Sequence, residues 1–364
     1  MRLAIRLAER GLGTTAPNPA VGAVIVDETT GEVVGRGWTQ PGGRPHAEVE
    51  AIARAGARAR GATMFVTLEP CAHYGKTPPC VDAVIAAGIG RVVCGIEDPD
   101  PRVGGKGLAK LRAHGIEVRR SVLRTATNWV TLGHILRVTE RRPMIQLKIA
   151  VSAKGEIHRG GDGQPAWVTG ETARRHGHLL RARADAILVG AATVRDDDPR
   201  LDCRLPGLDG RSPVRIALSR RLRVPPESQL VAKGGSPPVW WFCSPDATDE
   251  ERARIVARGG DVIPVRQVGD ALWLPAVLEA LVARGITRLL VEGGPAMWLA
   301  FDRVGLVDEV TLYHAGDRDE RDITPERAAE ALRRYVPRAA LPVVARRTLG
   351  SDAMYSFRRR VVSD

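Results

Sequence analysis

The stretch TLEPCAHYGKTPPC, residues 67–80, completes a predicted buried strand (63–68) and leads into a predicted helix (81–87). It contains two cysteines, Cys71 and Cys80, each directly after a proline. Upstream, His46 begins another predicted helix, and Glu48 follows two residues later. One imidazole and two thiolates suit Zn²⁺ and leave one tetrahedral position for water, as in catalytic zinc sites. We therefore predict a zinc site held by His46, Cys71 and Cys80.

The surroundings of these ligands indicate a hydrolytic reaction. Each cysteine is expected beside the start of a helix, where the helix dipole favours a thiolate. Glu48 is expected in the same first turn as His46, so it can face the metal's water and transfer protons as general acid–base. An H-x-E motif followed by P-C and a second Cys is the signature of zinc deaminases. A structural zinc site is the alternative, and it needs a fourth ligand, for which His73 is the nearest candidate.

Strand and helix signals alternate through the first 120 residues. Apolar runs predict strands at 22–26, 32–36, 63–68, 91–96 and 116–119, and helices are predicted at 2–10, 46–55, 81–87 and 107–114. Such alternation favours a mostly parallel sheet with helices on both faces. The polar, Arg-rich stretch 121–143 is interpreted as a helical linker, with a domain boundary near residue 143.

A second alternating region follows the boundary. Strands are predicted at 144–151, 186–189, 213–218, 239–242, 288–291 and 309–313, with helices at 171–182, 247–258, 270–284 and 296–304. Glu292-Gly293-Gly294 joins a strand to a helix, where free backbone amides can bind a cofactor phosphate. That signal is weak alone, because glycines often only turn a chain. Asp196-Asp197-Asp198 is expected to be a solvated turn.

Composition excludes several classes of protein. The chain has 364 residues, is 44% hydrophobic and carries a net charge of +12, which fits two globular domains and excludes a disordered protein. No run approaches the roughly 18 apolar residues of a membrane span. Only six of the 54 cationic residues are lysine, and no basic stripe with interleaved aromatics is present, so the charge favours phosphorylated metabolites over nucleic acid. Five scattered cysteines fit a reducing cytoplasm, and Cys94, Cys203 and Cys243 are expected to be inert core residues.

Eight residues separate the two ligand cysteines, whereas nucleic-acid-editing deaminases usually have two. This loop, with TTAPNPAVGAVIV (14–26) and HAEVEA (46–51), closely resembles the bifunctional riboflavin-biosynthesis deaminase–reductase family. The resemblance continues in IQLKIAVS (145–152), AWVTG (166–170), LLRARADAILVGAATVRDDDPRL (179–201) and LLVEGGPAMWLA (289–300). It implies an α/β protein with a cytidine-deaminase-like three-layer α/β/α domain (1–143) and a dihydrofolate-reductase-like α/β domain (144–364).

The resemblance also implies the reactions. The first domain would deaminate 2,5-diamino-6-ribosylamino-4(3H)-pyrimidinone 5′-phosphate with zinc. The second would then use NADPH to reduce the ribosyl group of 5-amino-6-(5-phosphoribosylamino)uracil to ribityl. The expected cofactors are one Zn²⁺ per subunit and NADPH. The expected partners are these phosphorylated pyrimidines and further copies of the chain in a homo-oligomer, with no nucleic acid and no membrane, in the cytoplasm.

Site residues carry over from the family position by position. Asn18, His73 and Lys76 would contact the substrate of the first domain, although a solvated loop charge remains the alternative for Lys76. The substrate positions of the second domain are Pro165, Arg181, Leu201, Arg204 and Glu292, and its two arginines suit a ribose-phosphate. Trp167 is either a cofactor contact or a packing residue. The cofactor positions are Ala150, Trp167, Thr193, Asp197, Ser219, Gly294, Pro295, Ala296, Met297, Trp298, Leu299 and Ala300.

The chain departs from the family pattern at three places in its second half. Lys154 stands where an acidic residue is usual, Ser219 stands where Asp is commoner, and the charged stretch 317–322 replaces an apolar loop. One alternative is therefore a deaminase whose second domain is structural or oligomerising. A nucleic-acid deaminase is another alternative, supported only by the net charge.

Overall fold

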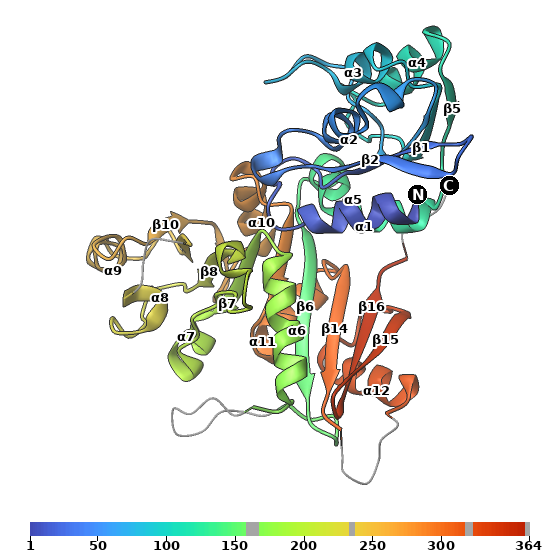
Figure 1. The fold of residues 1–364 in the computed structure, drawn as a ribbon. Coiled ribbons are helices and arrows are strands. Elements are labelled where there is room, and N and C mark those ends of the chain that lie inside the picture. The colour runs from blue at the N-terminus through green and yellow to red at the C-terminus, as the bar shows by residue number, and fades with distance from the viewer. Residues whose placement is uncertain (158–166, 233–236, 317–322, 361–364) are drawn as a thin grey trace. The chain divides into compact units, whose positions relative to one another are not determined.

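The structure is a computed structural model that describes residues 1–157, 167–232, 237–316 and 323–360 (Figure 1). Within these residues the chain divides into two compact units. The first contains Met1–Pro143 and the short segment Gly285–Thr287. The second contains Met144–Arg284 and Arg288–Arg360. Each unit is built around its own main β-sheet.

The first unit has a five-stranded sheet in the order β2-β1-β3-β4-β5. Its strands are β1 (Gly22–Asp27), β2 (Glu32–Trp38), β3 (Thr63–Leu68), β4 (Arg91–Ile96) and β5 (Glu117–Arg119). Only the pairs β3–β4 and β4–β5 are parallel, because β1 runs antiparallel to both β2 and β3. The expectation of a mostly parallel sheet is therefore wrong for this unit. A short turn between β1 and β2 can only return the chain antiparallel.

Helices cover both faces of this sheet, as the three-layer arrangement requires. They are α1 (Arg2–Gly11), α2 (Ala47–Ala55), α3 (Cys80–Ala86), α4 (Lys106–Ala113) and α5 (Arg124–Thr139). On β1, Val24 packs against α1, whereas Ala23 and Ile25 pack in the cluster that contains α2. Because successive strand residues point to opposite faces, α1 and α2 lie on opposite sides of the sheet.

The helix α2 lies unusually close to β2, which fixes the start of the helix relative to the sheet. A Cβ atom on Gly35 would come within 2.3 Å of the Ala51 carbonyl oxygen, and one on Gly37 within 2.1 Å of the Ala47 carbonyl oxygen. Glycine is therefore required at both positions, since any side chain would push α2 away from the sheet. His46 immediately precedes this closely packed helix.

The stretch 121–143 is not a linker, contrary to expectation. Most of it forms α5, whose residues Thr127, Val130, Leu132, His134 and Leu136 are buried in the first unit. The Arg-rich composition misled the sequence interpretation because the arginines lie at the ends of the helix and beyond it, while its middle is apolar.

The second unit has a nine-stranded sheet in the order β10-β9-β8-β7-β13-β6-β14-β16-β15. The strands from β10 to β14 in this order are parallel, and β16 and β15 extend the sheet antiparallel. Its strands are β6 (Met144–Val151), β7 (Ala186–Gly190), β8 (Val214–Leu218), β9 (Val239–Cys243), β10 (Asp261–Pro264), β13 (Arg288–Val291), β14 (Glu309–His314), β15 (Val343–Leu349) and β16 (Asp352–Arg358), and a separate ribbon pairs β11 (Gln267–Val268) with β12 (Ala271–Leu272).

Three of the second unit's helices, at 191–197, 229–232 and 325–335, were not predicted. The described residues of this unit form seven helices in all. They are α6 (Glu171–Ala182), α7 (Ala191–Asp197), α8 (Gln229–Ala232), α9 (Asp249–Val256), α10 (Leu274–Ala283), α11 (Pro295–Arg303) and α12 (Pro325–Tyr335). The solvated turn expected at 196–198 is wrong for Asp196 and Asp197, which lie in α7, whereas Asp198 follows the helix with a left-handed φ of 39°. None of the helices described is both long enough and apolar enough to cross a membrane.

Candidate active sites

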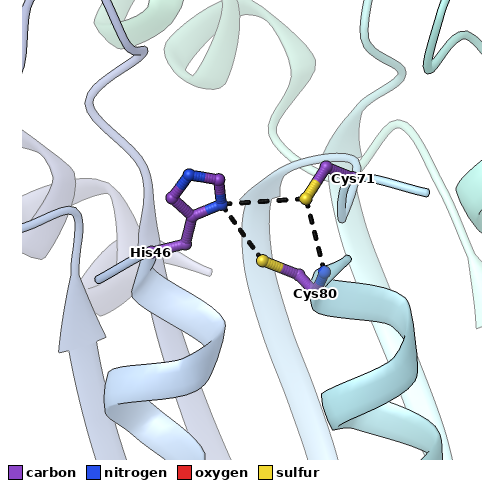
Figure 2. A group of neighbouring side chains, drawn as sticks. All are labelled: His46, Cys71 and Cys80. Atoms are coloured by element: carbon purple, nitrogen blue, oxygen red, sulfur yellow. Dashed lines mark hydrogen bonds between the residues drawn. The ribbon is translucent and has the colours of Figure 1, made fainter. Parts of the chain in front are cut away.

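The structure brings the three predicted zinc ligands together (Figure 2). His46 is the residue before α2, Cys71 lies in the loop after β3, and Cys80 is the first residue of α3. The Nδ1 atom of His46 lies 3.1 Å from the Sγ atom of Cys80 and 3.7 Å from that of Cys71. Cys71 does not precede a helix as expected, but its sulfur accepts the backbone N–H of Cys80 at 3.3 Å. The first residue of α3 therefore provides one of the two sulfurs and donates its backbone N–H to the other.

The donor set fits zinc in both chemistry and spacing. All three candidate ligand atoms lie within 4.8 Å of one another. Tetrahedral zinc with ordinary Zn–S and Zn–N lengths holds its ligand atoms about 3.5–3.8 Å apart, close to the distances found here. No fourth His, Cys, Asp or Glu joins this group among the residues that the structure describes. A site with three ligands and one open position is typical of catalytic zinc.

The two thiols differ in acidity because they share a hydrogen bond. Donation from Cys80 lowers the pKa of Cys71 to about 4, although burial acts in the opposite direction. The pKa of Cys80 is raised by the same hydrogen bond and by burial. A cation bound between the sulfurs and His46 would displace the proton of this hydrogen bond.

Glu48 lies in the first turn of α2 and is almost fully buried, with 3% of its surface exposed. Burial raises the pKa of its carboxyl group to about 7, and the nearby His46 opposes this rise. Glu48 does not belong to the three-ligand group. A buried carboxyl beside a metal site that it does not ligate is suited to proton transfer.

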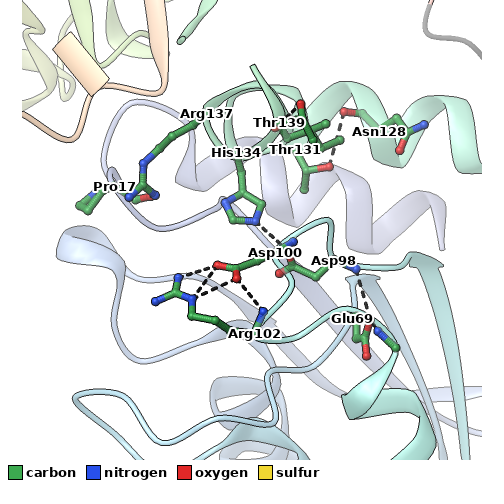
Figure 3. Close-up of polar contacts among 12 residues, drawn as sticks. Pro17, Glu69, Asp98, Asp100, Arg102, Asn128, Thr131, His134, Arg137 and Thr139 are labelled. Atoms are coloured by element: carbon green, nitrogen blue, oxygen red, sulfur yellow. Dashed lines mark hydrogen bonds and ion pairs between the residues drawn. The ribbon is translucent and has the colours of Figure 1, made fainter. Parts of the chain in front are cut away.

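A second buried carboxylate, Glu69, was missed by the sequence analysis and holds the loops around Cys71. It accepts the backbone N–H of Asp98 at 3.2 Å (Figure 3). It also accepts those of Gly105 at 2.9 Å and Leu108 at 3.1 Å. Gly105 and Leu108 belong to the start of α4, whose N-cap residue provides no side-chain cap. Glu69 therefore caps α4 from another element and fixes the chain two residues before Cys71.

Asp98 lies in the loop after β4 and connects that loop to α5. Its carboxylate lies 2.9 Å from the Nε2 atom of His134, and both side chains are buried (Figure 3). The next acidic residue, Asp100, forms an ion pair with Arg102 at 2.5 Å. The contact between Asp98 and His134 ties the loop after β4 to the middle of α5. This explains why α5 is part of the first unit.

The residues expected to contact the deamination substrate lie in or against the loops that carry the zinc ligands. Asn18 donates from Nδ2 to the Gly43 carbonyl at 2.8 Å, so it is held against the loop that leads to His46. His73 and Lys76 lie in the loop between the two cysteines, where Lys76 is exposed and the Nδ1 atom of His73 is buried without a partner among the described residues. The structure thus leaves both Lys76 alternatives open.

Arg44 is a further residue near this site that the sequence analysis did not identify. Its Nη1 atom donates to the Thr77 hydroxyl at 2.7 Å and lies 3.4 Å from Nε2 of His46. It thereby joins the loop between the cysteines to the histidine ligand. Only its position two residues before His46 could have signalled this role.

In the second unit, many predicted site residues lie at the carboxyl ends of parallel strands. Ala150 lies near the end of β6, Ser219 follows β8 with its backbone N–H bonded to Phe242, and Thr193 and Asp197 lie in α7 directly after β7. In parallel sheets, crevices at this edge bind ligands. Ala150, Thr193, Asp197, Ser219 and the start of α11 thus lie at the same edge of one sheet.

Two helices begin side by side at this edge. Gly190 precedes α7 and Gly294 precedes α11, at the ends of the neighbouring parallel strands β7 and β13. A Cβ atom on Gly293 would lie 4.0 Å from the backbone nitrogen of Gly190 and 3.0 Å from Met297 Cβ. The Met297 side chain lies against both starts, 3.1 Å from the Cβ position of Gly190. The backbone N–H groups of two neighbouring helix starts fit the phosphate groups of a dinucleotide such as NADPH.

Further along α11 the predicted cofactor positions differ in exposure. Ala296 is exposed, whereas Trp298 is buried and its ring meets that of Tyr335 edge-on at 5.8 Å. Pro295, Met297, Leu299 and Ala300 are partly buried. Only the first turn of this helix faces the strand edge in a way that a phosphate could use.

A buried ion-pair cluster lies beside these helix starts. Arg181 donates from Nε and Nη2 to the two carboxylate oxygens of Glu292, at 2.8 and 2.9 Å. Lys148 of β6, which the sequence analysis did not identify, places Nζ 3.6 Å from the same carboxylate. Burial alone would raise the pKa of Glu292, but the two cations hold it at about 2. The sequence signal that could have identified Lys148 is its positive charge within a strand that is mostly apolar.

The other predicted substrate positions are engaged within the chain or lie outside the described residues. Arg204 and Arg200 both pair with Asp202. Leu201 is buried with a φ of 56°, and Pro165 falls in 158–166, outside the described residues.

The remaining positions concern the cofactor and the departures from the family pattern. Trp167 is 65% exposed, with the Arg174 guanidinium 5.0 Å from its ring centre, so it is not a core residue. Lys154 is exposed, and the departure at 317–322 is also outside the described residues.

Comparison with known proteins identifies the domain that each unit resembles. The profile of the cytidine and deoxycytidylate deaminase zinc-binding region matches residues 1–96, and that of the RibD C-terminal domain matches residues 143–316. The riboflavin biosynthesis protein RibD of Escherichia coli is 40% identical over 326 residues, covering 86% of each chain. RibD of Mycobacterium tuberculosis is 38% identical over 321 residues, covering 86% of this chain and 84% of the relative.

Solved structures show the same two-unit chain. RibD of Acinetobacter baumannii has a TM-score of 0.80 and 30% identity, covering 98% of this chain and 97% of its own. A Thermotoga maritima diaminohydroxyphosphoribosylaminopyrimidine deaminase/5-amino-6-(5-phosphoribosylamino)uracil reductase has a TM-score of 0.77 and 34% identity, with the same coverage.

The fold and the two sites define an enzyme in which a zinc-binding deaminase unit precedes a reductase unit. The match to the RibD C-terminal domain favours this two-activity enzyme over a deaminase with a merely structural second unit. With relatives of this identity and coverage, the chain belongs to the RibD family of bifunctional deaminase/reductase enzymes of riboflavin biosynthesis. The predicted family, fold class, activities and cofactors, zinc and NADPH, are confirmed.

Proposed function

We propose that the first unit deaminates 2,5-diamino-6-ribosylamino-4(3H)-pyrimidinone 5′-phosphate and that Glu48 is its catalytic acid–base. The observation that carries this assignment is the convergence of His46, Cys71 and Cys80 with a buried, non-ligating carboxyl in the same helix turn. Zinc bound there supplies a water acidified towards neutral pH. The similar Thermotoga maritima protein is named for the deamination of this class of compound.

The chain's own residues account for the proton transfers. Glu48 is held in the first turn of α2, which the glycines of β2 bring close to the sheet, so its carboxyl has a fixed position. It accepts the proton of the attacking water, delivers it to a ring nitrogen and assists the departure of ammonia. Asn18 binds the pyrimidine, His73 contacts the substrate, and Lys76 binds the ribose-phosphate.

The second unit then reduces the ribosyl group of the deaminated product, with hydride supplied by NADPH. Thr193, Asp197, Ser219 and the first turn of α11 hold the cofactor, and Ala150 and Trp167 flank it. Arg181, Glu292 and Arg204 position the substrate. The neighbouring starts of α7 and α11 support this assignment, since they offer backbone donors for cofactor phosphates.

Two further statements belong to this proposal. The enzyme works in the cytoplasm, in keeping with five free cysteines among the described residues. It acts as a homo-oligomer, which size-exclusion chromatography with light scattering would test.

One assay tests both activities. The zinc-loaded enzyme receives the diaminopyrimidine ribotide and NADPH, and ammonia release and NADPH absorbance are followed separately. We expect ammonia without NADPH, and NADPH oxidation only after deamination. Ammonia release with no NADPH oxidation, in an enzyme that also fails on the deaminated ribotide, would overturn the reductase assignment and implicate Lys154 and Ser219.

A further inference from the structure

A groove with no assigned role follows the free edge of the first unit's sheet. β2 is the edge strand, and the groove, about 560 Å³ in volume, is lined by α1, β2 and the end of α2. Four arginines line it, namely Arg6 and Arg10 of α1, Arg36 of β2 and Arg54 of α2, together with Trp38. We call it the arginine groove. No acidic side chain lines it among the residues described.

The positive charge of the arginine groove is only partly neutralised. Arg54 pairs with Glu50 at 2.8 Å, whereas Arg6 and Arg36 have no carboxylate partner in the described parts of the chain. The guanidinium carbons of Arg10 and Arg54 each lie 5.1 Å from the centre of the Trp38 ring. Arg6 and Arg36 therefore leave positive charge in the groove that an anion bound there would neutralise.

The remaining wall of the groove is apolar. Leu3 and Val33 are exposed, at 39% and 37%, and Leu7 and Val34 complete the lining beside them. Guanidinium groups bind phosphate through paired hydrogen bonds and also stack on flat rings. The volume lies in the range of small-molecule sites. We propose that the arginine groove is a second, non-catalytic binding site for a phosphorylated aromatic heterocycle of mononucleotide size.

This site is separate from the zinc site. His46 precedes the first residue of α2, whereas Arg54 lies in its last turn. At 1.5 Å per residue these positions are about 12 Å apart along the helix axis. None of the groove residues is assigned to either reaction, so the inference stands independently of the proposed function.

Two other occupants fit the groove less well. A second copy of the chain in a two-fold contact would place the same arginines against one another, which like charges oppose. A nucleic-acid strand would have to continue past Glu32 and Glu50, which lie beside the groove and pair with Arg58 and Arg54. A single phosphate with one ring needs no such extension.

Site-resolved photolabelling tests the proposal. The full-length, zinc-loaded enzyme is irradiated with 4-thiouridine 5′-monophosphate, and labelled peptides are mapped by mass spectrometry. We expect saturable labelling of peptides covering residues 1–11 or 32–38. The unphosphorylated nucleoside should label them at least about tenfold less efficiently, because it lacks the charge-assisted hydrogen bonds. Labelling of the zinc-site or reductase peptides is read separately and does not bear on the groove.

Charge reversal in the groove provides the comparison. The Arg6→Glu/Arg36→Glu variant should raise the half-saturating probe concentration for these peptides at least about tenfold. The control Arg60→Glu/Arg112→Glu makes the same charge change at exposed residues outside the groove and should label like the unmodified enzyme. If the reversed variant does not fold, Arg6→Gln/Arg36→Gln replaces it, with zinc content and circular dichroism as the folding checks.

Several results would overturn the proposal. These are the absence of groove labelling, equal labelling by the nucleoside, and equal loss in the control and groove variants. A marked preference for an oligonucleotide over the mononucleotide would instead assign the groove to nucleic acid. Loss of labelling on dilution to a monomer would assign it to an interface between copies.

Discussion

At the scale of single residues, the zinc site depends on three atoms that three different elements bring together. Cys94 is a useful contrast, because it is also a buried thiol of the first unit but lies in β4 and bonds to the Ile96 carbonyl. Position, not residue type, therefore decides which cysteines can hold a metal. The ligand atoms of His46, Cys71 and Cys80 lie close enough together to hold one metal ion.

Cys71→Ser or Cys80→Ser should abolish stoichiometric zinc binding, because the hydroxyl of serine is a poor substitute for a thiolate ligand. We expect the unmodified chain to hold about one Zn²⁺. Metal content after dialysis, measured by atomic absorption, checks this. Cys94→Ser is the matched control and should keep its zinc. Zinc loss in that control would mean that the ligand set is wrong.

Glu292 gives a residue-level prediction about pH. Its pKa of about 2 is below the ordinary 4.5, so its ion pairs stabilise the fold above about pH 4.5, and this contribution is lost as the pH falls towards 2. Glu292→Gln should therefore be less stable than the unmodified enzyme at pH 6, by about 2–3 kcal/mol. The difference should shrink towards pH 2. Urea unfolding at several pH values measures it, and a difference independent of pH would contradict it.

At the scale of elements, most strands and helices of both units were predictable from apolar periodicity and glycine positions. β10, β15 and β16 were not predicted. β15 is an edge strand with arginines at 346 and 347 and little apolar burial. The run of three aspartates at 196–198 predicts a turn, but the first two lie in α7, which begins with the short apolar segment Ala191–Val194. Such elements form because neighbouring strands pair with them or cover them, and this information is not local in the sequence.

The same limit applies to the supporting residues of the site. The His, Glu and Cys of the zinc site follow a spacing pattern, so they could be found in the sequence. Glu69 and Arg44 act on loops far from them in the chain, through backbone amides and a threonine hydroxyl. No spacing rule identifies a carboxylate that caps a helix nearly forty residues away, so the sequence alone could not reveal it.

Glu69→Gln should weaken the connection between the Cys71 loop and α4. The amide group would turn an N–H₂ towards backbone donors that now share a carboxylate, leaving at least one buried N–H unpaired. We expect the free energy of unfolding to fall by about 1–3 kcal/mol. Glu97→Gln is the control, because Glu97 forms only an exposed ion pair with Arg120 and should lose less than about 1 kcal/mol. Chemical denaturation of the zinc-loaded proteins compares them, and equal losses would contradict the capping role.

At the scale of the whole molecule, the two sites are built from separate units with separate sheets. The zinc ligands, Glu48 and Glu69 all precede residue 109, and the ion-pair cluster of Arg181, Glu292 and Lys148 lies after residue 143. Within the first unit Glu69 holds the start of α4, and within the second unit Arg181 and Lys148 hold Glu292. Each chemistry therefore has its own supporting structure.

This separation predicts that each activity survives the loss of the other. Glu48→Gln should keep its zinc, lose about 10²–10⁴-fold in the rate of ammonia release, and still oxidise NADPH when given the deaminated ribotide. Arg181→Ala should release ammonia at the normal rate but reduce the deaminated ribotide poorly. Glu292 would lose its paired hydrogen bonds, and the substrate would lose a positioned guanidinium group. Separate assays of ammonia and NADPH, on separate substrates, compare the two variants. If folded, zinc-loaded Glu48→Gln also failed to reduce the deaminated ribotide, the two sites would have to share a substrate pocket or a compulsory transfer step, and the division of labour between the units would be wrong.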